Sequence, residues 1–179
     1  HDIGHGGSGR NVGLVNAGVW MPPSAVLAAL GPDRGPRFLR RFADGPAMVF
    51  DLIERHQIRC QWSHRGKVHV SATDKGRRNL KVLASRLSGL GEVAESWDKA
   101  RLKAYLGTDY FDYGVFTPGC ILMQPAALVT GLARSMPANV EIYEESAVSE
   151  FSDGATKSLN TAEGSVTTPR VILATNGWT

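Results

Sequence analysis

Apolar side chains recur every three or four residues in several stretches of the chain, which is the spacing of an amphipathic helix. After the break at Asp44-Gly45-Pro46, for example, Val49, Leu52 and Ile53 follow at helical intervals. Proline near the start of a stretch and glycine or proline after its end mark the limits. We therefore expect helices over residues 25–30, 36–42, 46–56, 75–90, 96–107 (capped by Ser96) and 125–137, the second and third forming a helical pair or one kinked helix.

Elsewhere apolar and polar residues alternate, which is typical of a strand with one buried face. Residues 58–72 alternate on both sides of Arg65-Gly66-Lys67, so we expect a β-hairpin there. Further strands are expected over 110–123 with a turn at 117–119, over 140–143 and 147–151, and in a hairpin around 162–164. The unbroken apolar run Val171-Ile172-Leu173-Ala174 predicts a strand buried on both faces, as in a parallel sheet beneath helices.

The segment Gly6-Gly7-Ser8-Gly9-Arg10-Asn11 carries the clearest candidate chemistry in the chain. Glycine lets a backbone approach a ligand where a Cβ would collide. The hydroxyl, the guanidinium and the side-chain amide between the glycines are donors suited to a phosphate group. The sequence therefore predicts a loop that contacts a phosphorylated cofactor.

Length and composition indicate an ordinary globular protein. The 179 residues are 42% hydrophobic, which suits one domain or two small lobes. No run approaches the roughly 18 apolar residues that span a bilayer, and the first residues do not resemble a signal peptide. We expect a soluble, cytoplasmic protein with no membrane partner.

The net charge of +3 is mildly basic, and the basic residues gather in two groups with helical spacing. Such groups predict solvated helix faces, because no aromatic residues interleave with them as in a binder of single-stranded nucleic acid. Nucleic acid is therefore not an expected partner. The two groups are Arg34, Arg37, Arg40 and Arg41, and Lys75, Arg77, Arg78 and Lys81.

Cysteine and histidine are too scattered to indicate a metal site. Cys60 and Cys120 lie far apart and are expected to be reduced thiols in the core. His56 fits a helix C-terminus, where positive charge is favourable. His64 and His69 flank a predicted turn without further ligands nearby, so both are expected on the surface.

Three motifs together resemble the FAD-dependent oxidoreductases of the D-amino acid oxidase type, the group that includes glycine oxidase, sarcosine oxidase and the γ-glutamylputrescine oxidases. The motifs are the glycine loop, Gln124-Pro125 leading into the helix over 128–133, and Val171 to Trp178. They span nearly the whole chain in the order of the family. The resemblance implies an α/β, mixed α+β fold: part of an FAD-binding sheet domain with an inserted helix-and-hairpin substrate or cap lobe.

The resemblance also implies boundaries and missing parts. Residues 1–20 would be the flavin-contacting loop region, 21–123 the inserted lobe and 124–179 the return to the FAD-binding domain. Family members open with a strand, a G-x-G-x-x-G turn and an acidic residue for the ribose, none of which is found here. The lobe that follows the last strand in relatives is also missing, so we expect an internal fragment.

Cofactor contacts carry over from the family motif residue by residue. The resemblance implies that Ser8, Gly9, Arg10 and Asn11 hold the phosphate and ribityl groups, and that Gly13 and Leu14 pass near the flavin ring. Many amine oxidases of the family have Gly and Gln where this chain has Val12 and Leu14, which leaves the substrate open. Further contacts are implied at Val148, for the adenine, and at Ala174, Thr175, Asn176 and Gly177, where the backbone passes the cofactor.

The implied reaction is oxidation of the C–N bond of a small-molecule amine or amino acid by hydride transfer to FAD, with no metal. No catalytic acid or base is identified in the chain, because the cofactor performs the chemistry. A fragment that lacks half of its site is expected to bind FAD weakly or not at all, and to self-associate through an exposed sheet edge. The alternative is a non-enzymatic phosphate- or peptide-binding interaction domain, with complete sheet edges and no exposed apolar seam.

Overall fold

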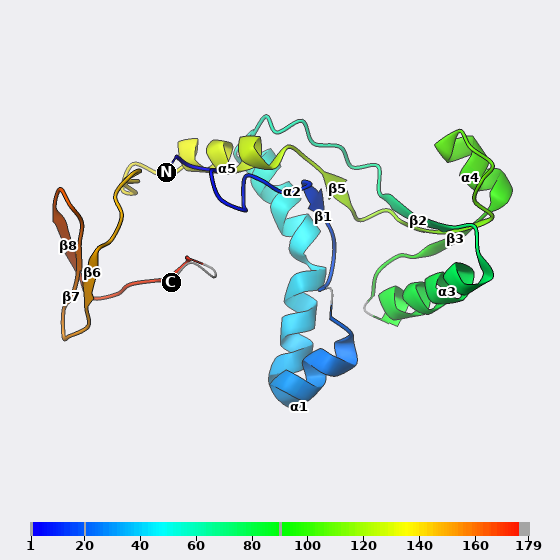
Figure 1. Ribbon diagram of the computed structural model, residues 1–179, viewed down its shortest axis with the longest axis horizontal. Coiled ribbons are helices and arrows are strands. Elements are labelled where there is room, and N and C mark those ends of the chain that lie inside the picture. Colours follow the sequence, from blue (N-terminus) through cyan, green and yellow to red (C-terminus); the bar gives the residue numbers. More distant parts are fainter. Residues whose placement is uncertain (1, 20, 90, 176–179) are drawn as a thin grey trace. The chain divides into compact units, whose positions relative to one another are not determined.

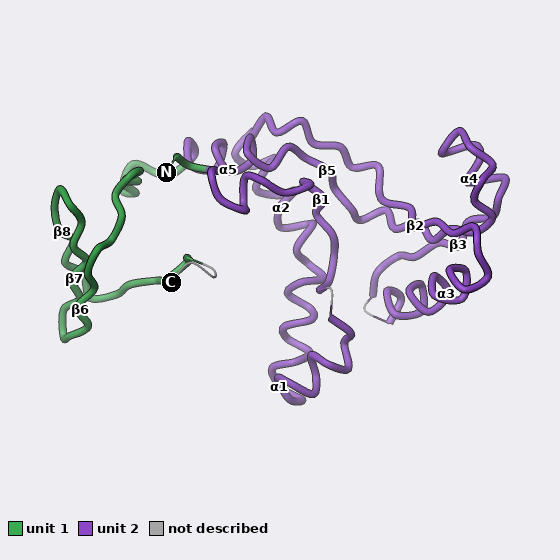
Figure 2. Tube along the Cα trace, viewed as in Figure 1, with its two compact units in different colours: residues 1–3, 136–179 green, residues 4–135 purple. Residues whose placement is uncertain are grey.

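The computed structural model describes residues 2–19, 21–89 and 91–175. It divides the chain into two compact units: Gly4–Ser135, and His1–Ile3 with Met136–Thr179 (Figure 2). Asn176 and Gly177, two of the predicted cofactor contacts, lie outside the described residues. The two units are taken separately below.

The larger unit begins with two helices whose limits follow from proline and glycine. Helix α1 (Pro23–Ala43) contains a kink at Gly31, whose φ of 73° is left-handed, so the two predicted helices around Gly31-Pro32 form one bent element (Figure 1). Helix α2 (Gly45–Arg55) starts at the predicted break and ends at His56, the expected helix C-terminus. The kink arises because Pro32 has no backbone N–H and disfavours helical geometry in the residue before it.

A three-stranded antiparallel sheet forms the second part of this unit. Its order is β2 (Lys67–Ser71), β4 (Tyr113–Thr117) and β3 (Glu95–Asp98). Helix α3 (Asp74–Gly89) packs against β2 and β4, and helix α4 (Lys99–Leu106) packs against β3 and β4 (Figure 1). The side chains of Leu102 and Val115 are fully buried between these elements.

A short ladder joins the start of the chain to the last helix of this unit. Strand β1 (Leu14–Val15) pairs antiparallel with β5 (Ile121–Leu122), and helix α5 (Pro125–Arg134) follows at once. The nearby core consists of Ile53, Ile58, Cys60 and Leu128. Cys60 and Cys120 are both buried free thiols, as expected.

Two local predictions in this unit are wrong. Residues 58–62 form no strand, because Gln57 and Gln61 have positive φ angles, and only Ser63 forms a bridge, with Leu122. Strand β2 pairs with β4 instead of forming the predicted hairpin. Ser96 lies in strand β3, and the cap of α4 is Asp98, whose carboxylate accepts a 2.9 Å hydrogen bond from Arg101 N.

The smaller unit is an antiparallel meander of β6 (Glu150–Ser152), β7 (Lys157–Asn160) and β8 (Ser165–Thr168). The hairpin around 162–164 is confirmed, but residues 140–143 and 147–149 form no strand. The predicted buried strand at 171–174 is also wrong for the described residues: Ile172 is 91% exposed and Leu173 is 68% exposed. A strand needs a hydrogen-bonded neighbour, and no described strand pairs with this run.

Glu95 gives the sheet a pH-dependent contact. Its carboxylate accepts hydrogen bonds from the Trp97 indole at 3.0 Å and from Arg101 at 2.8 Å, and the Arg101 guanidinium lies over the Trp97 ring. The indole hydrogen bond, with the charge of Arg101, lowers the pKa of Glu95 below its usual value. This contact therefore stabilises the fold above the unfolded-state pKa and is lost as pH falls through the folded-state pKa.

We expect the stability of the wild type to fall more steeply than that of Glu95→Gln as pH decreases from about 6 to about 3, across the usual carboxyl pKa. The difference is small because Glu95 is accessible to solvent, which screens its interactions. Urea midpoints of both proteins over this range measure it. Parallel pH profiles would show that the contact does not stabilise the fold.

Candidate functional site

The glycine loop is a tight turn that folds onto its own backbone. The amides of Gly9 and Arg10 donate to the carbonyl oxygen of Gly6 at 3.1 and 3.2 Å. A Cβ at Gly9 would lie 2.0 Å from the carbonyl oxygen of Gly4, so only glycine fits there. Gly9 is therefore required by the shape of the loop itself.

Asn11 braces the same turn through its side chain. Its amide nitrogen donates to the carbonyl oxygens of Gly7 and Ser8, each at 3.0 Å, and its Oδ1 accepts from Gly13 N at 2.8 Å. Both amide hydrogens are thus used within the loop. The sequence analysis did not predict this role, although the Asn-x-Gly spacing is typical of a side-chain-to-backbone turn and could have indicated it.

Gly13 fixes the loop to the core of the larger unit. Its carbonyl oxygen accepts from Met123 N at 2.9 Å, and its φ is +69°. A Cβ at this position would lie 1.8 Å from the Met123 carbonyl oxygen. Leu14, the next residue, pairs with Leu122 in the β1–β5 ladder, so the loop and the start of α5 are held together.

The outer rim of the loop offers donors that the described part of the protein does not use. Ser8 and Arg10 are exposed, and neither side chain has a hydrogen-bond or ionic partner among the described residues. A Cβ built at Gly6 or Gly7 meets nothing within 4 Å, so the fold of this chain gives no reason for glycine there. A hydroxyl and a guanidinium beside accessible backbone fit a ligand with phosphate and hydroxyl groups, as FAD has.

Helix α5 begins at the predicted Gln124-Pro125 motif. The Gln124 side chain caps the helix by accepting from Ala127 N at 2.6 Å, and the Gln124 backbone N–H donates to the Cys60 carbonyl oxygen at 2.8 Å. Gly131 allows the helix to approach Ile58, since a Cβ there would lie 2.3 Å from Ile58 Cγ2. The motif therefore has a structural role in this unit.

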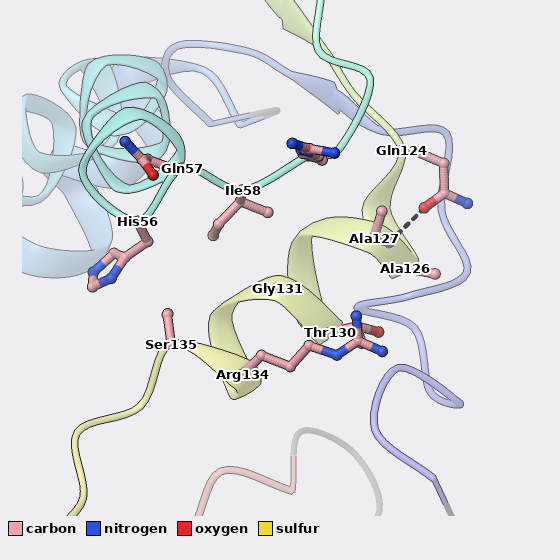
Figure 3. Close-up of a pocket in the computed structure, with 11 residues that line it drawn as sticks. His56, Gln57, Ile58, Gln124, Ala126, Ala127, Thr130, Gly131, Arg134 and Ser135 are labelled. Atoms are coloured by element: carbon pink, nitrogen blue, oxygen red, sulfur yellow. Dashed lines mark hydrogen bonds between the residues drawn. The ribbon is translucent and has the colours of Figure 1, made fainter.

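An open cleft of about 760 Å³ lies along α5, and sequence reasoning did not predict it (Figure 3). Arg134 lies along the helix near Thr130 (Figure 3). Arg59, which also lines the cleft, lies in the segment after α2. Among the described residues, the lining has no carboxylate or thiol; its polar side chains are an imidazole, two hydroxyls, two amides and two guanidiniums. Its residues are His56, Gln57, Ile58, Arg59, Gln124, Ala126, Ala127, Thr130, Gly131, Arg134 and Ser135.

The other predicted contacts lie in the smaller unit. Val148 is 52% exposed and is not part of a strand. Ala174 and Thr175 are exposed and also lie outside any strand. Their predicted contacts with a cofactor stay predictions, as do those of the residues beyond them.

Within the described ranges, no group of three or more histidine, cysteine or acidic residues could hold a metal ion. In the same ranges, no helix is both long and apolar enough to cross a bilayer.

The family of the chain follows from comparison with known proteins. The profile described as "FAD dependent oxidoreductase" matches residues 1–179, the whole chain. The chain belongs to this family. The chain is 25% identical to a probable oxidoreductase, OrdL, of Haemophilus influenzae and 25% identical to the γ-glutamylputrescine oxidoreductase of Escherichia coli. Each alignment covers 98% of this chain and 42% of the relative.

The fold agrees with the same family. The structure is similar to glycine oxidase from Geobacillus kaustophilus, with a TM-score of 0.72 and 21% sequence identity over 95% of this chain and 45% of the oxidase. The resemblance to the D-amino acid oxidase type, the mixed α/β fold and FAD as the family cofactor are therefore confirmed. The chain spans less than half the length of the curated relatives it matches.

Proposed function

We propose that this chain forms part of a longer flavoenzyme that oxidises the C–N bond of an amine or amino acid, and that the glycine loop is one wall of its FAD site. This enzyme is called the parent flavoenzyme below. Ser8 and Arg10 carry the proposal, because their donors lie exposed on a hydrogen-bonded loop and have no partner among the described residues. Membership of the FAD-dependent family supports the choice of ligand.

The proposed roles within the loop differ by residue. Arg10 neutralises negative charge on the cofactor, and Ser8 donates to a phosphate or ribityl oxygen. Gly9, Asn11 and Gly13 hold the backbone in the shape that presents these two side chains, and Leu14 borders the ring as a part of β1. FAD, when bound, supplies the hydride acceptor for the oxidation.

The class of substrate is proposed from the relatives. The similar proteins include one named γ-glutamylputrescine oxidoreductase and one named glycine oxidase, whose names refer to an amine and an amino acid. The backbone at Val148 and at Ala174, Thr175, Asn176 and Gly177 is proposed to complete the cofactor contacts in the parent flavoenzyme. The isolated chain is proposed to be inactive, because the glycine loop would contact the cofactor from one side only.

The interaction-domain alternative has less support. It requires a fold without an exposed apolar seam, whereas Ile172 and Leu173 are largely exposed. It also gives no reason for a family match across the whole chain. We therefore retain only the enzyme proposal.

Anaerobic mixing of the parent flavoenzyme with amines and amino acids is expected to bleach its visible flavin absorbance, since substrate oxidation reduces the flavin. Glycerol phosphate and 2-hydroxy acids serve as controls and should leave the absorbance unchanged. The purified 179-residue chain should carry no stoichiometric flavin. Reduction by the control compounds alone, or one bound FAD per isolated chain, would contradict the proposal.

A further inference from the structure

A second cleft, whose lining starts at Asn16 just after β1, combines a basic end with an apolar body. Its volume is about 460 Å³, within the range of small-molecule sites. Its lining comes from the segment after β1 and from α1, β2 and α3. Asn16, Lys67, His69 and Arg86 supply polar groups, while Leu39 and Leu83 represent the apolar lining.

The basic end is fixed by hydrogen bonds. Lys67 Nζ donates to Asn16 Oδ1 at 2.8 Å, and the same oxygen accepts from Cys120 Sγ at 3.4 Å. The segment after Asn16 is held in place because Gly18 N donates to the Phe42 carbonyl oxygen at 2.9 Å. Two of the three ammonium hydrogens of Lys67 and the side-chain amide hydrogens of Asn16 have no partner among the described residues.

The charges of this cleft are positive and unpaired within the described structure. Neither Lys67 nor Arg86 forms an ion pair with a described carboxylate. Glu92 is near enough to Lys67 for that charge to lower its pKa, although burial of Glu92 has the larger, opposite effect. His69, expected on the surface, is half-buried, and burial followed by the charge of Lys67 lowers its pKa.

The face of the sheet explains why these groups converge. Lys67 and His69 are two residues apart on β2 and therefore point to the same side, which α3 covers. Leu83 and Arg86 lie on α3 one turn apart, so an apolar and a cationic side chain reach the cleft together. Leu39 closes the apolar part from α1 and is itself buried.

We propose that this cleft, whose described lining contains no residue of the glycine loop, binds a small carboxylate with a short aliphatic body. Lys67 and Arg86 balance the carboxylate charge, and Asn16 donates a hydrogen bond to it. The aliphatic part of the ligand contacts Leu39 and Leu83. The proposal goes beyond the flavin chemistry and does not depend on it.

The test uses hexanoate as the probe and hexylamine and inorganic phosphate as controls. Titration into the full chain, followed by the NMR signals of the His69 imidazole and by calorimetry, should show saturable binding of hexanoate alone. Lys67→Met should weaken hexanoate binding at least tenfold. Arg86→Met should weaken it as well, and because Arg86 is exposed, this substitution should leave the fold intact. Lys75→Met, which removes an exposed lysine of α3 outside the cleft, should leave it unchanged.

Circular dichroism shows whether each variant keeps the wild-type fold. If Lys67→Met does not fold, the hexanoate affinity of Arg86→Met decides whether the proposal holds. Binding of hexylamine as tight as that of hexanoate would overturn the proposal, because the cleft would then be merely apolar. Equal affinity for phosphate would also overturn it, because the cationic end alone would then suffice. Loss of hexanoate binding in Lys75→Met would indicate nonspecific electrostatic attraction and would contradict it as well.

Discussion

Replacing Gly13 with alanine is expected to destabilise the larger unit by about 3 to 5 kcal/mol. The added Cβ would lie 1.8 Å from the Met123 carbonyl oxygen, a backbone atom that cannot move aside cheaply. The left-handed φ of +69° adds about 1 to 2 kcal/mol for any residue with a side chain. Overpacking and the strain on the hydrogen bond from Met123 N supply the rest.

Urea unfolding of the variant measures this loss, and Gly6→Ala is the matched control. Gly6 belongs to the same loop, but a Cβ there meets nothing within 4 Å. Its replacement should change the free energy of unfolding by no more than about 1 kcal/mol. Similar losses in both variants would show that the loop is not anchored through Gly13.

Replacing Gly7 with leucine is expected to abolish FAD binding by the parent flavoenzyme while leaving its fold intact. Gly7 is exposed, lacks a left-handed φ and has open space around its Cβ position, so the chain itself tolerates a side chain. The proposed cofactor lies in that space, beside Ser8 and Arg10. A leucine there would occupy the volume of the ligand, and we expect affinity to fall more than about 100-fold, or about 2.7 kcal/mol.

Helices were the most predictable part of this fold. The periodic apolar residues of α2 and α5 lie in or against the core, so packing and pattern agree there. Strands were less predictable because their pairing is not local. Residues 58–62 alternate like a strand but contain a left-handed Gln61, whereas Glu95–Asp98 forms an unexpected strand because β4 lies beside it.

The apolar run at 171–174 is a second case in which strand formation depends on non-local pairing. Its composition suits a doubly covered strand, but the described structure provides neither a hydrogen-bonded neighbour nor a covering helix, and Ile172 is exposed. The local sequence therefore indicates that this segment could form a buried strand. Whether it does depends on neighbouring strands, which the local sequence does not specify.

The candidate site was predictable in its chemistry and only partly in its geometry. Glycines among polar residues identified the loop, yet Gly9 serves the fold of the loop while Gly6 and Gly7 leave open space. The cleft beside Lys67 had no sequence signal, because Asn16 and Lys67 are 51 positions apart and meet only when β1 pairs with β5 and β2 pairs with β4. The cleft therefore forms through long-range strand pairing, which the spacing of residues along the chain does not indicate.

The central claim is that the cofactor lies against the open rim of the glycine loop. Fluorescence titration of FAD into the parent apoenzyme carrying Gly7→Leu tests it most directly, with thermal unfolding recorded on the same samples. The account predicts wild-type unfolding without measurable FAD binding. Wild-type FAD affinity in that folded variant would contradict it.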